Sequence, residues 1–190
     1  MSKEQLMLDV DQAGELKAMF RREGWTNKDI KALCEKKGLG TLFLEVLEGR
    51  SEIKPVEYLI DLDTDPFIPE GWRVKEHKKG GQWKYDSTKV GLYLSEKQLC
   101  GKIGGYDLLK ELESQPVMNA NMLEFYLKNT YLIPSEWKGK AIIFWGTIYC
   151  FTDGDFCVRY LHWNGKSWHW FYFWLSLNFD DYYTAVVLNK

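Results

Sequence analysis

Apolar residues recur at helical spacing near the start of the chain. Leu16, Met19 and Phe20 share one helical face, the stretch TNKD resembles the capping box of a second helix, and a third apolar repeat covers 41–48. The pattern predicts three short helices within residues 1–55. Since this region carries ten basic and ten acidic side chains, we interpret the helices as a small structural bundle rather than a DNA-reading helix-turn-helix.

The middle of the chain mixes strand and helix patterns. WRVKEH and QWKYD flank the turn KKGG, whose glycines accept positive φ, so a β-hairpin is expected over 72–86. KVGLYL predicts a further strand. Helices are expected over 106–112 and 120–128, and the second begins after the capping residue Asn119.

The last third predicts a three-stranded antiparallel meander. The stretches AIIFWGTIYCF, FCVRYLHW and KSWHWFYFWL are separated by Asp153-Gly154 and Asn164-Gly165, which are strong hairpin signals. If both loops have two residues, Leu161 lies opposite Trp168 and Cys150 opposite Cys157. One face of the meander then holds Trp163, Trp168, Trp170, Tyr172 and Trp174 with Arg159, Cys150 and Ile148, and the other holds Tyr149, Phe151, Phe156, Val158, Tyr160, His169, Phe171 and Phe173.

The predicted fold class is therefore α+β, with N-terminal short helices, a central β-hairpin and helices, and a C-terminal three-stranded antiparallel aromatic meander. We expect a helical N-terminal region over 1–55 and an α+β domain over 56–190. Whether the first region is a separate domain stays open at this stage.

Both faces of the last predicted strand are aromatic, whereas a strand with one wet face alternates apolar with polar residues. Two interpretations stay open. In the first, helices cover both faces of the sheet. In the second, one aromatic face is exposed and binds a ligand.

Composition and charge narrow the class of protein. The 190 residues are 45% hydrophobic and 27% charged, which is typical of globular proteins, and they include nine Trp. The net charge of −2 argues against general nucleic-acid binding. No apolar run is long enough to span a membrane, and the first ten residues are too polar for a signal peptide, so we expect a cytoplasmic protein.

No cofactor or metal site is predicted. Asp61, Asp63 and Asp65 have the spacing that opens a calcium loop, but Pro66 stands where that loop needs Gly. The four cysteines show no CxxC spacing, and we expect all of them to be free thiols.

Four stretches carry a resemblance to a protein family: DTDPFIPEGWRVKEHKKGG, PVMNANMLEFYLKN, LIPSEWKGKAIIFWGTIY and VRYLHWNGKSWHWFYFWL. Together, over roughly residues 55–190, they resemble a family of uncharacterised function in candidate-phyla bacteria. The family's tail looks like the variable region of a protein targeted by a diversity-generating retroelement. Such targets are ligand-binding display proteins, commonly with a C-type-lectin-like fold, and they vary where the adenines of a template are miscopied.

The resemblance implies a fixed face and a variable surface. The fixed face would comprise Trp163, Trp168, Trp170, Tyr172 and Trp174. Randomising an Asn codon at its adenines cannot yield Lys, Glu, Gln or Met, and none of these occurs between Ser167 and Asn189. The ligand-binding residues would be Tyr160, His169, Phe171, Phe173, Ser176, Asn178, Asp180, Asp181, Tyr182 and Tyr183.

The function expected is a non-enzymatic binding module for a protein or peptide, and its partner is not identified. One alternative is a carbohydrate-binding module, because stacked aromatic rings also hold sugars. Another is nucleic-acid binding through the basic hairpin, over 73–84. An enzyme is the least favoured alternative: it would use His162 and His169 with Asp180 or Asp181, and no catalytic motif accompanies them.

Overall fold

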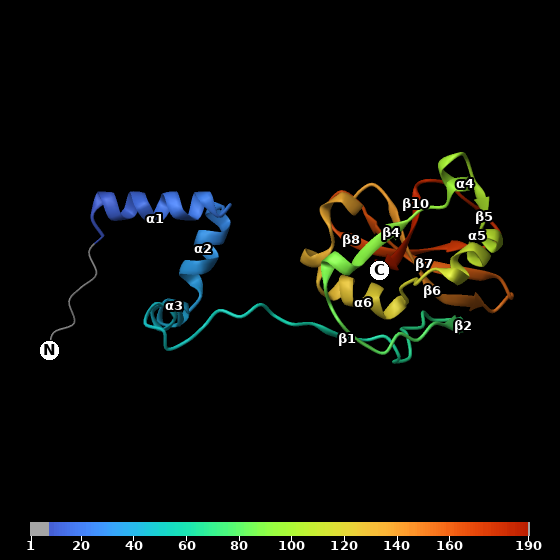
Figure 1. The fold of residues 1–190 in the computed structure, drawn as a ribbon, viewed down its shortest axis with the longest axis horizontal. Coiled ribbons are helices and arrows are strands. Elements are labelled where there is room, and N and C mark those ends of the chain that lie inside the picture. The colour runs from blue at the N-terminus through green and yellow to red at the C-terminus, as the bar shows by residue number, and fades with distance from the viewer. Residues whose placement is uncertain (1–7, 190) are drawn as a thin grey trace. The chain divides into compact units, whose positions relative to one another are not determined.

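A computed structural model describes residues 8–189, and it divides the chain into two compact units, Met1–Val56 and Glu57–Lys190 (Figure 1). The described part of the first unit contains the three predicted helices. Their bounds are α1 (Val10–Arg22), α2 (Asn27–Glu35) and α3 (Leu39–Leu47). Capping boxes begin the first two, from Asp9 to Gln12 and from Thr26 to Asp29. However, no residue of the three helices is buried, so the predicted bundle with a packed core is not present.

The second unit contains both strands and helices, which confirms the α+β class. Its strands are β1 (Leu59–Asp61), β2 (Trp72–His77), β3 (Gln82–Lys84), β4 (Val90–Tyr93), β5 (Ile103–Gly104), β6 (Ala141–Phe151), β7 (Phe156–Trp163), β8 (Trp168–Trp174), β9 (Asn178–Phe179) and β10 (Tyr183–Leu188). Its helices are α4 (Glu96–Leu99), α5 (Gly105–Glu111) and α6 (Ala120–Lys128), with 3-10 turns η1 (Ser87–Lys89), η2 (Leu112–Ser114), η3 (Thr130–Leu132) and η4 (Ser135–Trp137).

The main sheet has the strand order β4-β10-β6-β7-β8, and β2 also pairs with β6. The chain returns from β8 through β9 to β10, which runs parallel to β6, while the other pairs are antiparallel. As a result β8 is an edge strand with β7 as its only partner among the described strands.

The three-stranded meander is confirmed, but both predicted registers are wrong. The loop after β7 holds four residues, so Leu161 faces Trp170 rather than Trp168. That shift of two residues leaves every side chain of β7 and β8 on its predicted face. The loop before β7 is a three-residue loop closed by a bond from Phe151 N to Asp155 O, and Cys157 therefore faces Tyr149 instead of Cys150.

That second shift is odd, so it exchanges the faces of the last residues of β6. Tyr149 and Phe151 pack with Cys157 and Trp174, and not with the residues predicted beside them. Ile148 packs with Val158 on the opposite face. The predicted register assumed a two-residue loop at Asp153-Gly154, but the loop has three residues.

The predicted hairpin over 72–86 is also wrong. β2 pairs with β6, and β3 pairs with β1, so the arms on either side of KKGG lie in different sheets. The apolar side chains of the two arms pack in different places. Trp72 and Val74 pack with Tyr149, whereas Trp83 packs against the cluster that contains Ile60. In the segment between the two arms, Gly81 has the expected positive φ, 72°.

The two faces of the sheet are covered by different helices. On one face, Met122, Leu123 and Tyr126 of α6 pack with Ile142 and Leu161. On the other face, Leu108 of α5 and the adjacent Leu112 pack with Trp145, Val158 and Phe179. We call these the α6 face and the α5 face. The sequence left two interpretations open: helices on both faces, or an exposed aromatic face. The structure has features of both. Each face carries a helix, but neither helix covers all of β8.

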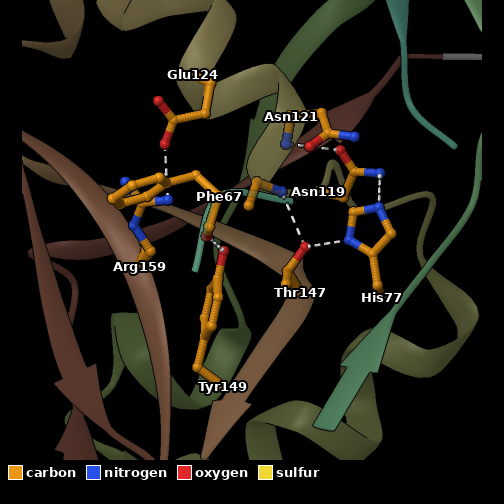
Figure 2. Close-up of polar contacts among 9 residues, drawn as sticks. Phe67, His77, Asn119, Asn121, Glu124, Thr147, Tyr149 and Arg159 are labelled. Atoms are coloured by element: carbon orange, nitrogen blue, oxygen red, sulfur yellow. Dashed lines mark hydrogen bonds and ion pairs between the residues drawn. The ribbon is translucent and has the colours of Figure 1, made fainter. Parts of the chain in front are cut away.

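A buried polar network fixes the start of α6 to the sheet (Figure 2). Thr147 Oγ1 accepts the Ala120 N–H at 3.0 Å and lies 2.8 Å from His77 Nδ1. Nε2 of His77 lies 3.2 Å from the Leu62 carbonyl, which can only accept. Asn119 Nδ2 lies 3.4 Å from the same ring nitrogen and donates to the Leu62 carbonyl at 2.7 Å. Burial lowers the pKa of His77 because it disfavours the charged ring.

This network predicts a loss of stability in mild acid. Since the pKa of His77 is lower in the folded than in the unfolded chain, the unfolded state binds more protons, and the free energy of unfolding falls as the pH drops below about 6.5. Urea denaturation between pH 7.5 and pH 5 should show this fall in the wild type. His77→Gln should flatten it, and His169→Gln, at an exposed histidine, should retain it. Equal slopes in all three proteins would contradict the assignment.

Two further findings concern sequence predictions. None of the helices described over residues 8–189 is long and apolar enough to cross a membrane. The four cysteines are free: Cys34 and Cys100 are exposed, while Cys150 and Cys157 are buried. Burial raises the pKa of Cys157 to about 12, so this thiol stays protonated and unreactive at neutral pH.

Candidate functional site

An exposed aromatic surface lies on the α5 face, at the β8 edge of the sheet. We call it the open aromatic face, and it comprises Tyr160, His162, His169, Phe171 and Tyr182. The register places His162 opposite His169 and Tyr160 opposite Phe171. Phe171 is 47% exposed, and its ring centroid lies 6.0 Å from that of Tyr160 and 5.9 Å from that of His162. β7, β8 and the loop before β10 thus contribute to one surface.

Hydrogen bonds hold the two histidines of this face. The Tyr182 hydroxyl lies 2.9 Å from His162 Nδ1, and the Ser167 hydroxyl lies 2.9 Å from His169 Nε2. Burial raises the pKa of Tyr160 to about 12 and also raises that of Tyr182, so both phenols are neutral donors at physiological pH. The face therefore presents flat apolar rings with hydroxyl and imidazole groups between them.

The predicted ligand-binding residues divide into three groups. Tyr160, His169, Phe171 and Tyr182 lie on the open aromatic face. Phe173 and Tyr183 are half-buried and stack on each other with centroids 4.3 Å apart, beneath Phe179. Ser176, Asn178, Asp180 and Asp181 lie on the return from β8 to β10, where Asn178 pairs with Gly104, Asp180 is half-buried and the other three are exposed.

Sequence reasoning missed Gln98 as a residue that positions this tail. Gln98 is buried, and its side-chain amide donates to the carbonyls of Asp180, at 2.7 Å, and Tyr183, at 2.6 Å. These bonds fix the backbone on both sides of Tyr182. The α4 segment gives one local signal, the capping-box pattern SEKQ, but nothing in it points to residues more than eighty positions away.

The predicted fixed face is the α6 face of the same strands, and its burial is uneven. Trp168 is 8% exposed, and Trp163, Trp170 and Trp174 are half-buried, but Tyr172 is 40% exposed. Tyr172 lies against Trp72, with centroids 5.0 Å apart, and against Phe151. Tyr172 is therefore the most exposed ring of this row, at the edge of the sheet.

Figure 2 shows a buried ion pair between Arg159 and Glu124. Arg159 is 1% exposed, and its guanidinium lies 4.2 Å from the centroid of Trp170 and 5.2 Å from that of Phe67. Glu124 Oε1 of α6 approaches Arg159 Nη1 to 2.7 Å. No guanidinium nitrogen has an aligned hydrogen-bond acceptor among the described residues, so the charge of Glu124 and the aromatic rings stabilise this cation.

His162 and His169 are the histidines that the enzyme alternative would use. His162 and His169 are directly opposite each other, although the predicted register had set them apart. Over residues 8–189, neither forms a hydrogen bond or ion pair with a carboxylate. The same residues contain no group of three His, Cys, Asp or Glu side chains that could hold a metal ion. Asp63, from the calcium-like spacing, instead accepts the N–H groups of Gly80 and Gly81.

The basic residues expected to bind nucleic acid do not act as one hairpin. Arg73 contacts Cys150, His77 belongs to the network at α6, and Lys84 pairs with Glu57. Trp72, at the start of the same segment, packs on Phe151 with centroids 4.4 Å apart. The basic residues over 73–84 therefore lie on, or between, two strands that do not pair with each other.

Comparison with protein-family models, curated proteins and solved structures finds no match to this chain. The resemblance to a retroelement-diversified family and its C-type-lectin-like fold stay expectations.

Proposed function

We propose that the chain is a binding module that holds a protein or peptide ligand on the open aromatic face. The observation that carries this proposal is the exposure of Phe171 on a surface that also presents Tyr160 and His169. Large exposed aromatic groups are costly to leave in water and are enriched at the centres of interfaces. Tyr and Phe also lose little conformational entropy when they bind.

The distribution of variable positions supports a diversified tail. The nine tail residues of the predicted ligand-binding set, from His169 to Tyr183, are all exposed or half-buried. Between and beside them, Trp168, Leu175, Phe179 and Thr184 are buried. Variation at seven of these positions would alter the surface, whereas Phe173 and Tyr183 also pack on the core. We therefore propose that the tail is the variable segment of a display protein.

Binding can be tested without a known ligand. A random peptide library is panned against the full chain, and the Kd of a selected peptide is measured for the wild type and for Phe171→Ala. As the central exposed ring, Phe171 should act as a hot spot, so the substitution should weaken binding by about 30-fold. Tyr106→Ala is the matched control, since Tyr106 is an exposed aromatic residue on α5, and it should bind like the wild type.

Other outcomes would point elsewhere. If no peptide depends on Phe171 while a glycan array yields a Phe171-dependent sugar, the carbohydrate alternative replaces the proposal.

The diversification is tested separately in the genome. A nearby reverse-transcriptase gene and a second, imperfect copy of the segment that encodes 163–187, differing at adenines, would support it. Copies that differ at other bases would contradict it.

A further inference from the structure

The outer edge of β8 presents backbone groups with no partner. In an antiparallel pair, residues alternate between those that bond to the neighbouring strand and those that point away. Leu175 N donates to Phe156 O at 2.9 Å, which fixes this alternation along the β7–β8 ladder. The N–H and C=O groups of Trp168, Trp170 and Tyr172 therefore point away from β7, and they form no hydrogen bond within residues 8–189.

This edge lacks the features that normally prevent strand addition. Edge strands are usually short, bulged, or protected by Lys or Pro. β8 spans seven residues, its ladder with β7 has no register shift, and no charged residue or proline occurs from Ser167 to Phe179. The strand at the opposite end of the sheet, β4, spans only four residues.

The sequence of β8 is nearly the same in both directions. WHWFYFW is symmetric about Phe171: Trp168 corresponds to Trp174, and Trp170 corresponds to the similar ring of Tyr172. A strand with this symmetry can pair antiparallel with a second copy of itself about a two-fold axis at Phe171. Trp168 then meets Trp174, Phe171 meets its own copy, Trp170 meets Tyr172, and His169 meets Phe173.

We propose that two copies of this chain associate through their β8 edges and form one continuous sheet. In this register Trp170 lies opposite Tyr172 of the second copy, and such a pair exchanges both of its backbone N–H···O bonds. The two Phe171 residues face each other at a non-hydrogen-bonded position, where side chains approach most closely. Directly opposite residues share a face of the sheet, so the open aromatic faces of both copies become neighbours.

The chemistry of the strand favours a second copy over an unrelated peptide. An isologous contact brings a charge at the two-fold axis close to its own copy, and a strand without charges avoids that repulsion. The aromatic side chains on both faces also match an equally aromatic partner, since aromatic cross-strand pairs stabilise a sheet.

A charge swap at the two-fold axis tests the proposal on the full chain. Sedimentation equilibrium should show a dimer for the wild type at micromolar concentration. Phe171→Lys alone and Phe171→Glu alone should each weaken the dimer by at least about 100-fold, because like charges face each other, and an equimolar mixture should restore it. A wild-type monomer, single variants that remain dimeric, or a mixture that stays monomeric would each overturn the proposal.

A cysteine variant tests the register. In a Cys34→Ser, Cys100→Ser background, Phe171→Cys should form a disulfide-linked dimer on mild oxidation, because the two positions lie directly opposite. His169→Cys is the matched control and should not link, since its partner in this register is Phe173. Equal linking at both positions would exclude the proposed axis.

The proposed dimer and the proposed ligand binding can be tested independently of each other. Phe171→Ala removes the ring but leaves the backbone edge and adds no charge, so we expect this variant to remain dimeric while it loses peptide binding. A monomeric wild type that still binds a peptide through Phe171 would remove the dimer and keep the proposed function.

Discussion

Replacing Glu124 with Gln should destabilise the second unit by about 3–5 kcal/mol, because it leaves a buried guanidinium without its counter-charge. Arg159 is 1% exposed, and the Glu124 carboxylate, 2.7 Å away, is the negative group that faces it. Since the guanidinium nitrogens have no aligned acceptor among the described residues, the neutral amide cannot replace that charge. Urea denaturation followed by tryptophan fluorescence measures the loss, and Glu136→Gln, at an exposed position, should change stability little.

The same reasoning predicts a rescue. Removing the cation as well, in the double variant Glu124→Gln, Arg159→Met, should recover most of the lost stability, because an apolar side chain of similar length has no charge to desolvate. The rings of Trp170 and Phe67 would then pack on a flexible thioether. If Glu124→Gln cost less than about 1 kcal/mol, the guanidinium would have to be solvated, contrary to its burial.

The elements predicted most accurately are those with local signals. The capping residue Asn119 and the apolar pattern after it predicted α6 with its bounds, and the Asp-Gly and Asn-Gly turns predicted three strands in the correct order. Turn length was the weak point. One residue more between β6 and β7 moved Tyr149 to the other face, because side chains alternate along a strand.

Partners distant in the sequence could not be predicted in this way. Nothing local to KKGG indicates that β2 pairs with a strand seventy residues later, and no short pattern links Gln98 to the backbone of Asp180. The candidate site was predicted in part for the same reason. The alternation along β8 identified Phe171 and His169 as sharing a face, but the contact of Tyr182 with His162 depends on how the chain returns from β8 to β10.

The segment that returns from β8 to β10 also determines which aromatic residues of β8 are buried and which are exposed. Phe179 of β9 is fully buried between Trp145, 5.2 Å away, and Phe173, 5.0 Å away, measured between ring centroids. It covers the end of β8 that carries Phe173 and leaves the region around Phe171 open. Within one strand, the first phenyl ring is therefore available to a ligand, and the second belongs largely to the core.

Phe179→Ala should accordingly cost about 3–5 kcal/mol, since it removes a fully buried ring and leaves a cavity. Phe171→Ala is the matched control on the same tail and should change stability by less than about 1 kcal/mol, because its ring is already 47% exposed. Thermal and urea unfolding of both variants measure the difference. Losses of equal size would mean that both rings are core, and the open aromatic face would then have no exposed ring at its centre to bind a partner.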